Sequence, residues 1–413
     1  MSIPEMNLIE GHRPITPADG IPVWDVDPYD ENILRNPLDY YAQLRRQGDV
    51  VYIPRYSVLA VGRYAVTHKV FSDHVNFVSS RGVGLNDFAL GKPWRQPSII
   101  LEVDPPEHTR TRKVMARVLS PKIMKTLANL FQDIAEKVVD DIISKGSIEA
   151  VAELAEIYPT SVFPKAVGMK DVNPRYLVDY GAMVFNGTGP DNALRRHSMA
   201  NAGVIVPWIT SACARDRLTD NGLGAMVYAQ ADKGEISHDE AAMLVRSFLS
   251  AGVDTTVTGI GNALWCLSQN PGEWEKLKSS PGLCRPAFEE VLRITSPVHT
   301  FCRTAGCDTQ IAGFPVAEGS KVLCVLGAAN TDSEKWGDPE NFRIDRRPVG
   351  HVAFGAGIHG CVGQNLARAE LEALLSVMLK KIDRIEPSGE AIWRPGNSIR
   401  ALDKLPLKLV PIT

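Results

Sequence analysis

The pattern of apolar and polar positions along the chain predicts a protein built mainly of helices. Ser237 and Glu240 have the spacing of a capping box, and the helix they begin is expected to continue to about residue 269. Short strands are expected at 50–53 and 57–61 and again within 310–325, so the β part is minor. Further helices are expected at 36–47, 66–71, 108–119, 121–145, 159–168, 174–186, 192–217, 286–294 and from 364 onward.

The spacing of Pro and Gly gives no sign of a linker, so residues 1–413 are expected to form a single large domain. A hydrophobic content of 44% is sufficient for a large core, and a net charge of -3 gives no nucleic-acid signal. Residues 1–20 contain no apolar run, which argues against a signal peptide or membrane anchor. Seven cysteines without a framework spacing indicate reduced thiols. We therefore expect a soluble, cytoplasmic protein.

The segment 354–363 places one cysteine, Cys361, in a glycine-rich loop directly before a helix. Three glycines allow positive φ angles, and the amides at the helix N-terminus favour a thiolate. A lone thiolate suits an axial bond to haem iron, and His359 could then donate to a haem propionate. The alternative is a buried structural thiol.

The pattern from Phe354 through His359 and Cys361 resembles the haem-binding loop of the cytochrome P450 family. The resemblance covers nearly the whole chain. It implies haem b with the Cys361 thiolate as iron ligand, and O2 as co-substrate. It also implies the P450 fold, with haem between the long central helix and the Cys loop.

His108 and Arg112 are four residues apart on the helix that Pro106 introduces, and so share one face. Two cations on one face suit the two haem propionates, although a solvated basic face is the alternative. The resemblance favours propionate binding and adds Arg303 as a third ligand.

Glu290 and Arg293 are spaced for a salt bridge within one helix. In the family this pair is buried and shapes the thiolate loop together with an arginine from the preceding loop. Asn341 stands where that arginine is expected, so Arg346 is the candidate substitute.

The central helix contains Gly252 in its middle, which costs about 1 kcal/mol relative to alanine. Such a cost is acceptable where a helix bulges or passes near a ligand, and the alternative is a kinked core helix. The stretch 251–256 resembles the family's oxygen-activation motif. The resemblance implies that Gly252 lies near the haem, that Asp254 relays protons, and that Thr255 donates a hydrogen bond to bound dioxygen.

Ser247, Ala251 and Thr255 recur every four residues and share a face. Ser247 lies ~6 Å along the axis from Ala251 and ~12 Å from Thr255, which suits a rod-like substrate. Arg246 beside Ser247, and Arg95 near Ser98, could bind a carboxylate at its polar end. The alternative for both arginines is surface charge.

These Arg/Ser pairs, with 79–85 and 93–106, resemble family members that oxidise para-substituted benzoates, notably 4-methoxybenzoate O-demethylases. The resemblance implies demethylation to 4-hydroxybenzoate with formaldehyde release. Thr188 replaces a phenylalanine of those relatives, which predicts a roomier or more polar para end. The apolar wall would be Leu101, Phe185, Val298 and Phe301.

Electrons must come from outside, because the chain has no flavin or iron–sulfur motif. We expect a ferredoxin with an NAD(P)H-dependent reductase, docking at Arg110, Lys113 and Arg117, and we expect a monomer. A monooxygenase of neutral phenolics such as alkylguaiacols is an alternative, which the two arginines oppose. A non-catalytic haem-thiolate sensor is another, which Asp254 and Thr255 oppose.

Overall fold

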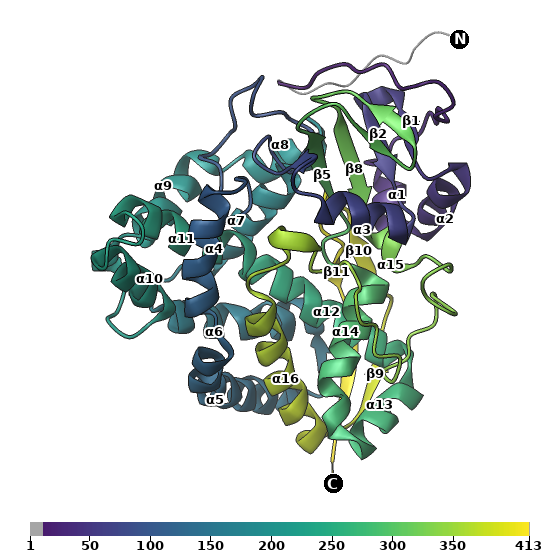
Figure 1. Ribbon diagram of the computed structural model, residues 1–413. Helices are drawn as coiled ribbons and strands as arrows, with labels where there is room; N and C mark the ends of the chain where they lie inside the picture. The colour runs from purple at the N-terminus through teal and green to yellow at the C-terminus, as the bar shows by residue number, and fades with distance from the viewer. Residues whose placement is uncertain (1–10, 413) are drawn as a thin grey trace.

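The computed structural model describes residues 11–412 and is mainly helical (Figure 1). The expectation for residues 1–20 falls partly on residues 1–10, which lie outside the described part. The helices are α1 Glu31–Arg35, α2 Leu38–Gln47, α3 Tyr64–Ser72, α4 Glu107–Val118, α5 Pro121–Lys145, α6 Ile157–Val167, α7 Pro174–Asn186, α8 Ala193–Met199, α9 Ala202–Ala212, α10 Leu223–Asp232, α11 His238–Ala251, α12 Val253–Gln269, α13 Pro271–Ser279, α14 Cys284–Thr295, α15 Leu326–Asn330 and α16 Gln364–Lys381.

The strands form one five-stranded sheet and three smaller ones. The larger sheet has the order β1-β2-β8-β5-β3, in which only β2 and β8 run parallel. The strands are β1 Val51–Ile53, β2 Val58–Val61, β3 Phe77–Val78, β4 Ser147–Glu149, β5 Thr300–Ala305, β6 Thr309–Ile311, β7 Phe314–Val316, β8 Lys321–Val325, β9 Ile382–Pro387, β10 Ile392–Arg394, β11 Ala401–Lys404 and β12 Pro406–Pro411.

The mainly helical fold with a minor β part is confirmed, and two long helices differ from the prediction. The expected helix over 192–217 is interrupted: α8 ends at Met199, α9 begins at Ala202 and contains Pro207, and a short 3-10 turn follows. The break at residues 200–201 precedes Pro207, which α9 accommodates although proline removes a backbone donor. The capping box is confirmed, since the Glu240 N–H donates to Ser237 Oγ at 3.1 Å and the Ser237 N–H donates to Glu240 Oε2 at 2.8 Å. The helix that it opens divides at Gly252 into α11 and α12.

The apolar core surrounds α12, most of whose residues are buried. Helices α7 and α14 and strand β11 pack against α12, while α16 packs along α5 and α14. In Figure 1, α12 runs through the interior and the short helical turn before α16 lies above it, next to α3. These elements hold the central helix and the Cys361 loop within one packed body. Between residues 11 and 412, no helix is long and apolar enough to cross a bilayer.

Candidate active site

The Cys361 loop is a tight backbone turn in the segment between α15 and α16. Gly355 and Gly357 have φ angles of 72° and 68°, a region that favours glycine. A Cβ on Gly357 would lie 2.8 Å from the Ser72 Cα, so α3 also requires glycine there. The Cys361 N–H donates to the Phe354 carbonyl at 2.7 Å, which closes the turn. Three positive-φ glycines were expected, but only Gly355 and Gly357 of the four glycines in this loop have a positive φ. Gly360 and Gly363 have φ of -49° and -84°.

Burial and the neighbouring groups shift the pKa of the Cys361 thiol in opposite directions. Burial raises the pKa of its thiol, whereas the amides of Gly363 and Gln364 and the Arg112 and Arg368 guanidinium groups act to lower it. A coordinating thiol is deprotonated by the metal it binds. The loop thus supplies donors for a thiolate, and a bound metal cation would complete its stabilisation.

Buried basic groups gather beside this loop, with Asp104 as their neighbouring carboxylate. The rings of His108 and His359 are 4.3 Å apart, and the side chain of Arg303 lies over the Phe71 ring at 4.1 Å. His108 Nε2 and His359 Nδ1 are buried without hydrogen-bond partners in the described chain. Burial, followed by the nearby His359 and Arg112, lowers the pKa of His108 to about 4.

Arg112 and Arg303 make no ion pair with any residue from 11 to 412. The acidic neighbour of the cluster is Asp104, whose Oδ1 lies 3.5 Å from His359 Nε2 and accepts from the Ser79 amide. Unsatisfied buried donors are costly, so this cluster fits an anionic ligand. Haem, with two propionates and an iron for Cys361, has the required chemistry, and His108, Arg112, Arg303 and His359 are brought together as predicted.

The central helix breaks at Gly252. A Cβ at this position would lie 2.4 Å from the Phe163 ring on α6, so close helix packing accounts for the glycine, and its contact with the cofactor stays a prediction. Thr255 Oγ1 donates to the Ala251 carbonyl at 2.5 Å, across the break. Ala251 is exposed and Ser247 and Thr255 are half-buried, which agrees with a shared accessible face.

Asp254 points into the protein rather than along that accessible face. It is 2% exposed, and its Oδ1 lies 3.4 Å from Nη2 of Arg394 on β10. A Cβ on Gly181 of α7 would lie 2.5 Å from the Asp254 Cβ, so the carboxyl sits against that helix. Burial raises the pKa of Asp254, and Arg394 acts against this rise. Sequence reasoning missed Arg394, which lies 140 residues away along the chain.

The predicted carboxylate-binding residues converge on one loop. An acidic residue that was not predicted, Glu102, lies among them. We call Arg95, Ser98, Glu102 and Arg246 the head cluster. Arg246 Nη2 donates to the carbonyls of Gln96 and Pro97 at 2.9 and 3.2 Å, which ties α11 to the loop. Arg95 Nη1 lies 3.0 Å from Glu102 Oε2. Neither arginine is simple surface charge, since Arg246 is half-buried and the Arg95 side chain is 10% exposed.

Ser247 is adjacent to the head cluster, but its hydroxyl donates to the Met243 carbonyl at 3.1 Å. Such a bond to the preceding turn is common for serine in helices and leaves the oxygen as an acceptor only. A role of Ser247 in substrate binding stays a prediction.

The predicted apolar wall is partly assembled. The rings of Phe185 and Phe301 stack at 6.4 Å, and Val298 packs in the same cluster. Ile399 and Ala401 complete this cluster and were not predicted, because no local pattern marks them. Leu101 is not part of this cluster; it follows Ser98, and its amide donates to Ser98 Oγ at 3.2 Å.

The Thr188 hydroxyl is hydrogen-bonded within the protein and does not remain free for a ligand. It donates to the Phe185 carbonyl at 2.7 Å and also contacts Ser398 Oγ. A Cβ on Gly84 would come within 2.5 Å of the Thr188 carbonyl oxygen, so the backbone is tightly packed. The smaller side chain is compatible with a roomier site, whereas the hydroxyl gives little support to a more polar one.

The structural triad behind the Cys loop is present. Arg293 donates to both oxygens of Glu290 at 2.7 and 2.8 Å, and both side chains are fully buried. Arg346 Nε donates to Glu290 Oε1 at 2.8 Å, and its Nη2 donates to the carbonyls of Asp338 and Asn341. The suggestion that Arg346 completes the triad is thus supported by its contacts.

The proposed ferredoxin face is less basic than expected. Arg110 pairs with Glu240, and Arg117 pairs with Glu235. Lys113 is exposed and makes no ion pair with a residue of the described chain. Only Lys113 of the three therefore presents an uncompensated charge.

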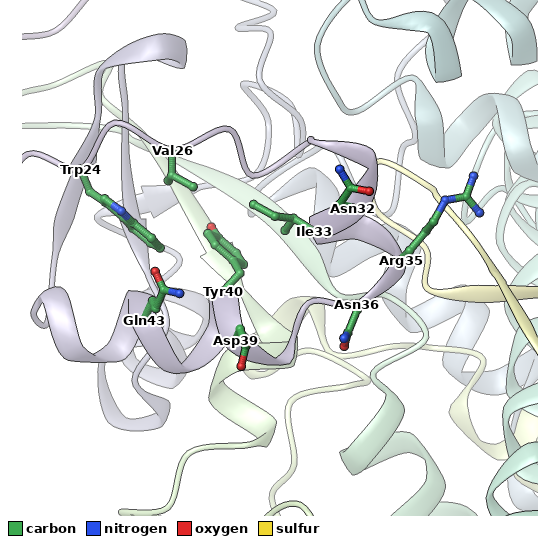
Figure 2. Close-up of a pocket in the computed structure, with 9 residues that line it drawn as sticks. All are labelled: Trp24, Val26, Asn32, Ile33, Arg35, Asn36, Asp39, Tyr40 and Gln43. Atoms are coloured by element: carbon green, nitrogen blue, oxygen red, sulfur yellow. The ribbon is translucent and has the colours of Figure 1, made fainter.

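A surface groove on the N-terminal side contains none of the predicted site residues. Figure 2 shows it between α1, α2 and the segment before β1. It is lined by Trp24, Val26, Asn32, Ile33, Arg35, Asn36, Asp39, Tyr40 and Gln43.

Comparisons with known proteins agree with this arrangement. The family description "Cytochrome P450" matches residues 283–402. Cytochrome p450 CYP199A2 of Rhodopseudomonas palustris is 44% identical over 406 residues, covering 98% of each chain. Beta-dihydromenaquinone-9 omega-hydroxylase of Mycobacterium tuberculosis is 29% identical over 401 residues, covering 94% of this chain and 79% of that one.

Two solved structures share the fold over nearly the full length. Cytochrome P450 CREJ in complex with (4-ethylphenyl) dihydrogen phosphate has a TM-score of 0.82 at 25% identity, covering 93% of this chain and 98% of that one. Cytochrome P450 CYP109Q5 from Chondromyces apiculatus has a TM-score of 0.79 at 28% identity, covering 94% and 99%. The chain belongs to the cytochrome P450 family of haem-thiolate monooxygenases.

Proposed function

We propose that this P450 oxidises a para-substituted benzoate, and that its main reaction is O-demethylation of 4-methoxybenzoate to 4-hydroxybenzoate. The observation that supports it is the head cluster, in which Arg246 of α11 contacts the loop that carries Arg95. Two such cations would have no role toward a neutral phenolic substrate.

The head cluster retains donors for a carboxylate. Arg95 Nε is buried without a hydrogen-bond partner in the described chain. Ser98 Oγ accepts from the Leu101 amide, so its own hydrogen remains for a ligand. Burial lowers the pKa of Arg246, and an anion beside it would offset that cost through charge-assisted hydrogen bonds.

The remaining site residues would hold the ring and manage protons. The stacked Phe185 and Phe301 offer a flat apolar surface to a benzene ring. Haem, when bound through Cys361, supplies the activation of dioxygen. Asp254 would pass protons inward from solvent, which reaches it beside the 36% exposed Arg394 side chain, and Thr255 would place a hydroxyl beside the reacting oxygen. Hydroxylation of the methoxy carbon gives a hemiacetal, which breaks down to formaldehyde and the phenol.

The proposed electron donors are a ferredoxin and its NAD(P)H-dependent reductase. Lys113→Glu should lower the ferredoxin-supported rate and leave the peroxide-supported rate unchanged, because only the former requires docking. Equal loss with both donors would contradict docking at this face.

The proposed reaction is tested by product analysis with the haem-loaded protein, a ferredoxin and its reductase. We expect formaldehyde and 4-hydroxybenzoate in equal amounts from 4-methoxybenzoate. Arg246→Ala should raise KM at least tenfold, whereas the control Arg175→Ala, on exposed α7 surface, should leave KM unchanged. Equal efficiency with 4-methoxybenzamide or with an alkylguaiacol would refute carboxylate recognition.

A further inference from the structure

Glu102 places a buried negative charge inside a cluster that is proposed to bind an anion. It is 6% exposed, and its Oε2 lies 3.0 Å from Arg95 Nη1 and accepts from the Ser98 amide at 2.7 Å. No motif marks this residue. A carboxylate at a carboxylate-binding site repels its own ligand, so its presence needs a reason.

The charges of the head cluster add up to a single net positive charge. Arg95 and Arg246 each contribute one positive charge and Glu102 one negative charge. Burial, the Arg95 charge and the Glu102 charge all act on Arg246, so the three groups are close enough to interact. Buried charges are tolerated when they are paired, and an unpaired one is costly. One singly charged ligand therefore neutralises the cluster, whereas a doubly charged ligand leaves an excess negative charge.

We propose that Glu102 is a specificity-determining residue that restricts the head cluster to monoanions. It does so by cancelling the charge of Arg95 while holding that side chain for hydrogen bonding. Aryl carboxylates are accepted and dianions such as aryl phosphates are disfavoured. This inference rests on the proposed function, because it assumes that the substrate's anionic group binds here.

The rival explanation is purely structural, because the same carboxylate also fixes the loop through Ser98. Glu102→Gln separates the two roles, since the amide oxygen still accepts from the Ser98 N–H but carries no charge. Glu102→Asp retains the charge. The double variant Arg95→Gln/Glu102→Gln removes one charge of each sign and keeps the net charge at one.

The experiment is a spin-state titration of the haem-loaded protein at pH 7.5 with 4-methoxybenzoate, 4-methoxybenzamide and 4-methoxyphenyl phosphate, which is largely dianionic at that pH. For Glu102→Gln, we expect the ratio of the phosphate Kd to the carboxylate Kd to fall at least tenfold, or about 1.4 kcal/mol. Glu102→Asp, the double variant and the exposed control Glu107→Gln should keep the wild-type ratio within twofold. The carbon monoxide difference spectrum verifies thiolate ligation in each variant.

If Glu102→Gln weakens the binding of both anions equally, or keeps the wild-type ratio of the phosphate Kd to the carboxylate Kd, the inference is overturned. The proposed function is then left intact. A tenfold change in the double variant would also overturn the inference, and this test remains if Glu102→Gln does not fold. Wild-type protein that binds the amide as tightly as the acid would overturn the proposed function, and the inference with it.

Discussion

Glu370 is a buried carboxyl on α16, the helix that begins just after the Cys361 loop, and its replacement by glutamine should change how stability depends on pH. The side chain is fully buried, and neither of its oxygens has a hydrogen-bond partner in the described chain. Burial disfavours the charged form and raises the pKa of Glu370 from 4.5 to about 8. The folded protein therefore keeps this acid protonated at neutral pH.

The sign and size of the effect follow from proton linkage. The folded state binds this proton more tightly than the unfolded state, so its contribution to stability is greatest below pH 4.5 and is lost as the pH rises to about 8. Between pH 6 and pH 8 the free energy of unfolding should fall by about 2 kcal/mol from this group alone. Glutamine matches the shape of the protonated acid and carries no titrating proton, so Glu370→Gln should lack this loss.

The assay is guanidinium unfolding of the haem-loaded protein, followed by circular dichroism at pH 6, 7 and 8. We expect the difference between Glu370→Gln and wild type to grow by about 2 kcal/mol in favour of the variant over that range. The control is Glu372→Gln, an exposed position on the same helix, which should parallel the wild type. Parallel pH dependence of Glu370→Gln and wild type would refute the burial argument.

Three further substitutions test separate parts of the site. Arg346→Ala leaves the buried Glu290 with one guanidinium partner and should cost about 3 kcal/mol of unfolding free energy with loss of haem, while the exposed Arg343→Ala should not; equal stability would contradict a structural role. Arg394→Gln removes the cation that lowers the pKa of Asp254, so the limb of the kcat profile that reports Asp254 should move to higher pH; superimposable profiles would exclude Arg394 from the relay. Thr188→Phe should shift preference from 4-ethoxybenzoate toward 4-methoxybenzoate by filling the para end, and an unchanged ratio of kcat/KM values would refute a roomier site.

Features encoded by neighbouring residues were predictable from the sequence. The capping box at Ser237, the Cys361 loop and the Glu290–Arg293 pair each depend on residues within ten positions of one another, so spacing alone marks them. Arg346 could be suggested because a known pattern required a third partner from a nearby loop, and its 2.8 Å bond to Glu290 agrees.

Features that depend on distant segments could not be predicted. Arg394 lies 140 residues from Asp254, and no local pattern relates the two. Glu102 pairs with Arg95, which is near it in the sequence, but its effect on the net charge of the head cluster depends also on Arg246 from α11. The sequence alone therefore gave no reason to single out Glu102. The helix was expected to continue through Gly252, with the glycine explained by a bulge or a nearby ligand. The Phe163 ring of α6 supplies a packing reason that only the tertiary structure shows.

The central claim, that a carboxylate anchors the substrate over the haem, is tested most directly by one spectral titration. Purified ferric protein is titrated with 4-methoxybenzoate and, separately, with 4-methoxybenzamide. We predict that the acid alone shifts the Soret band from low-spin to high-spin, because only the acid satisfies Arg246 and Arg95. An equal shift with both ligands, or a shift with the amide alone, would contradict the account.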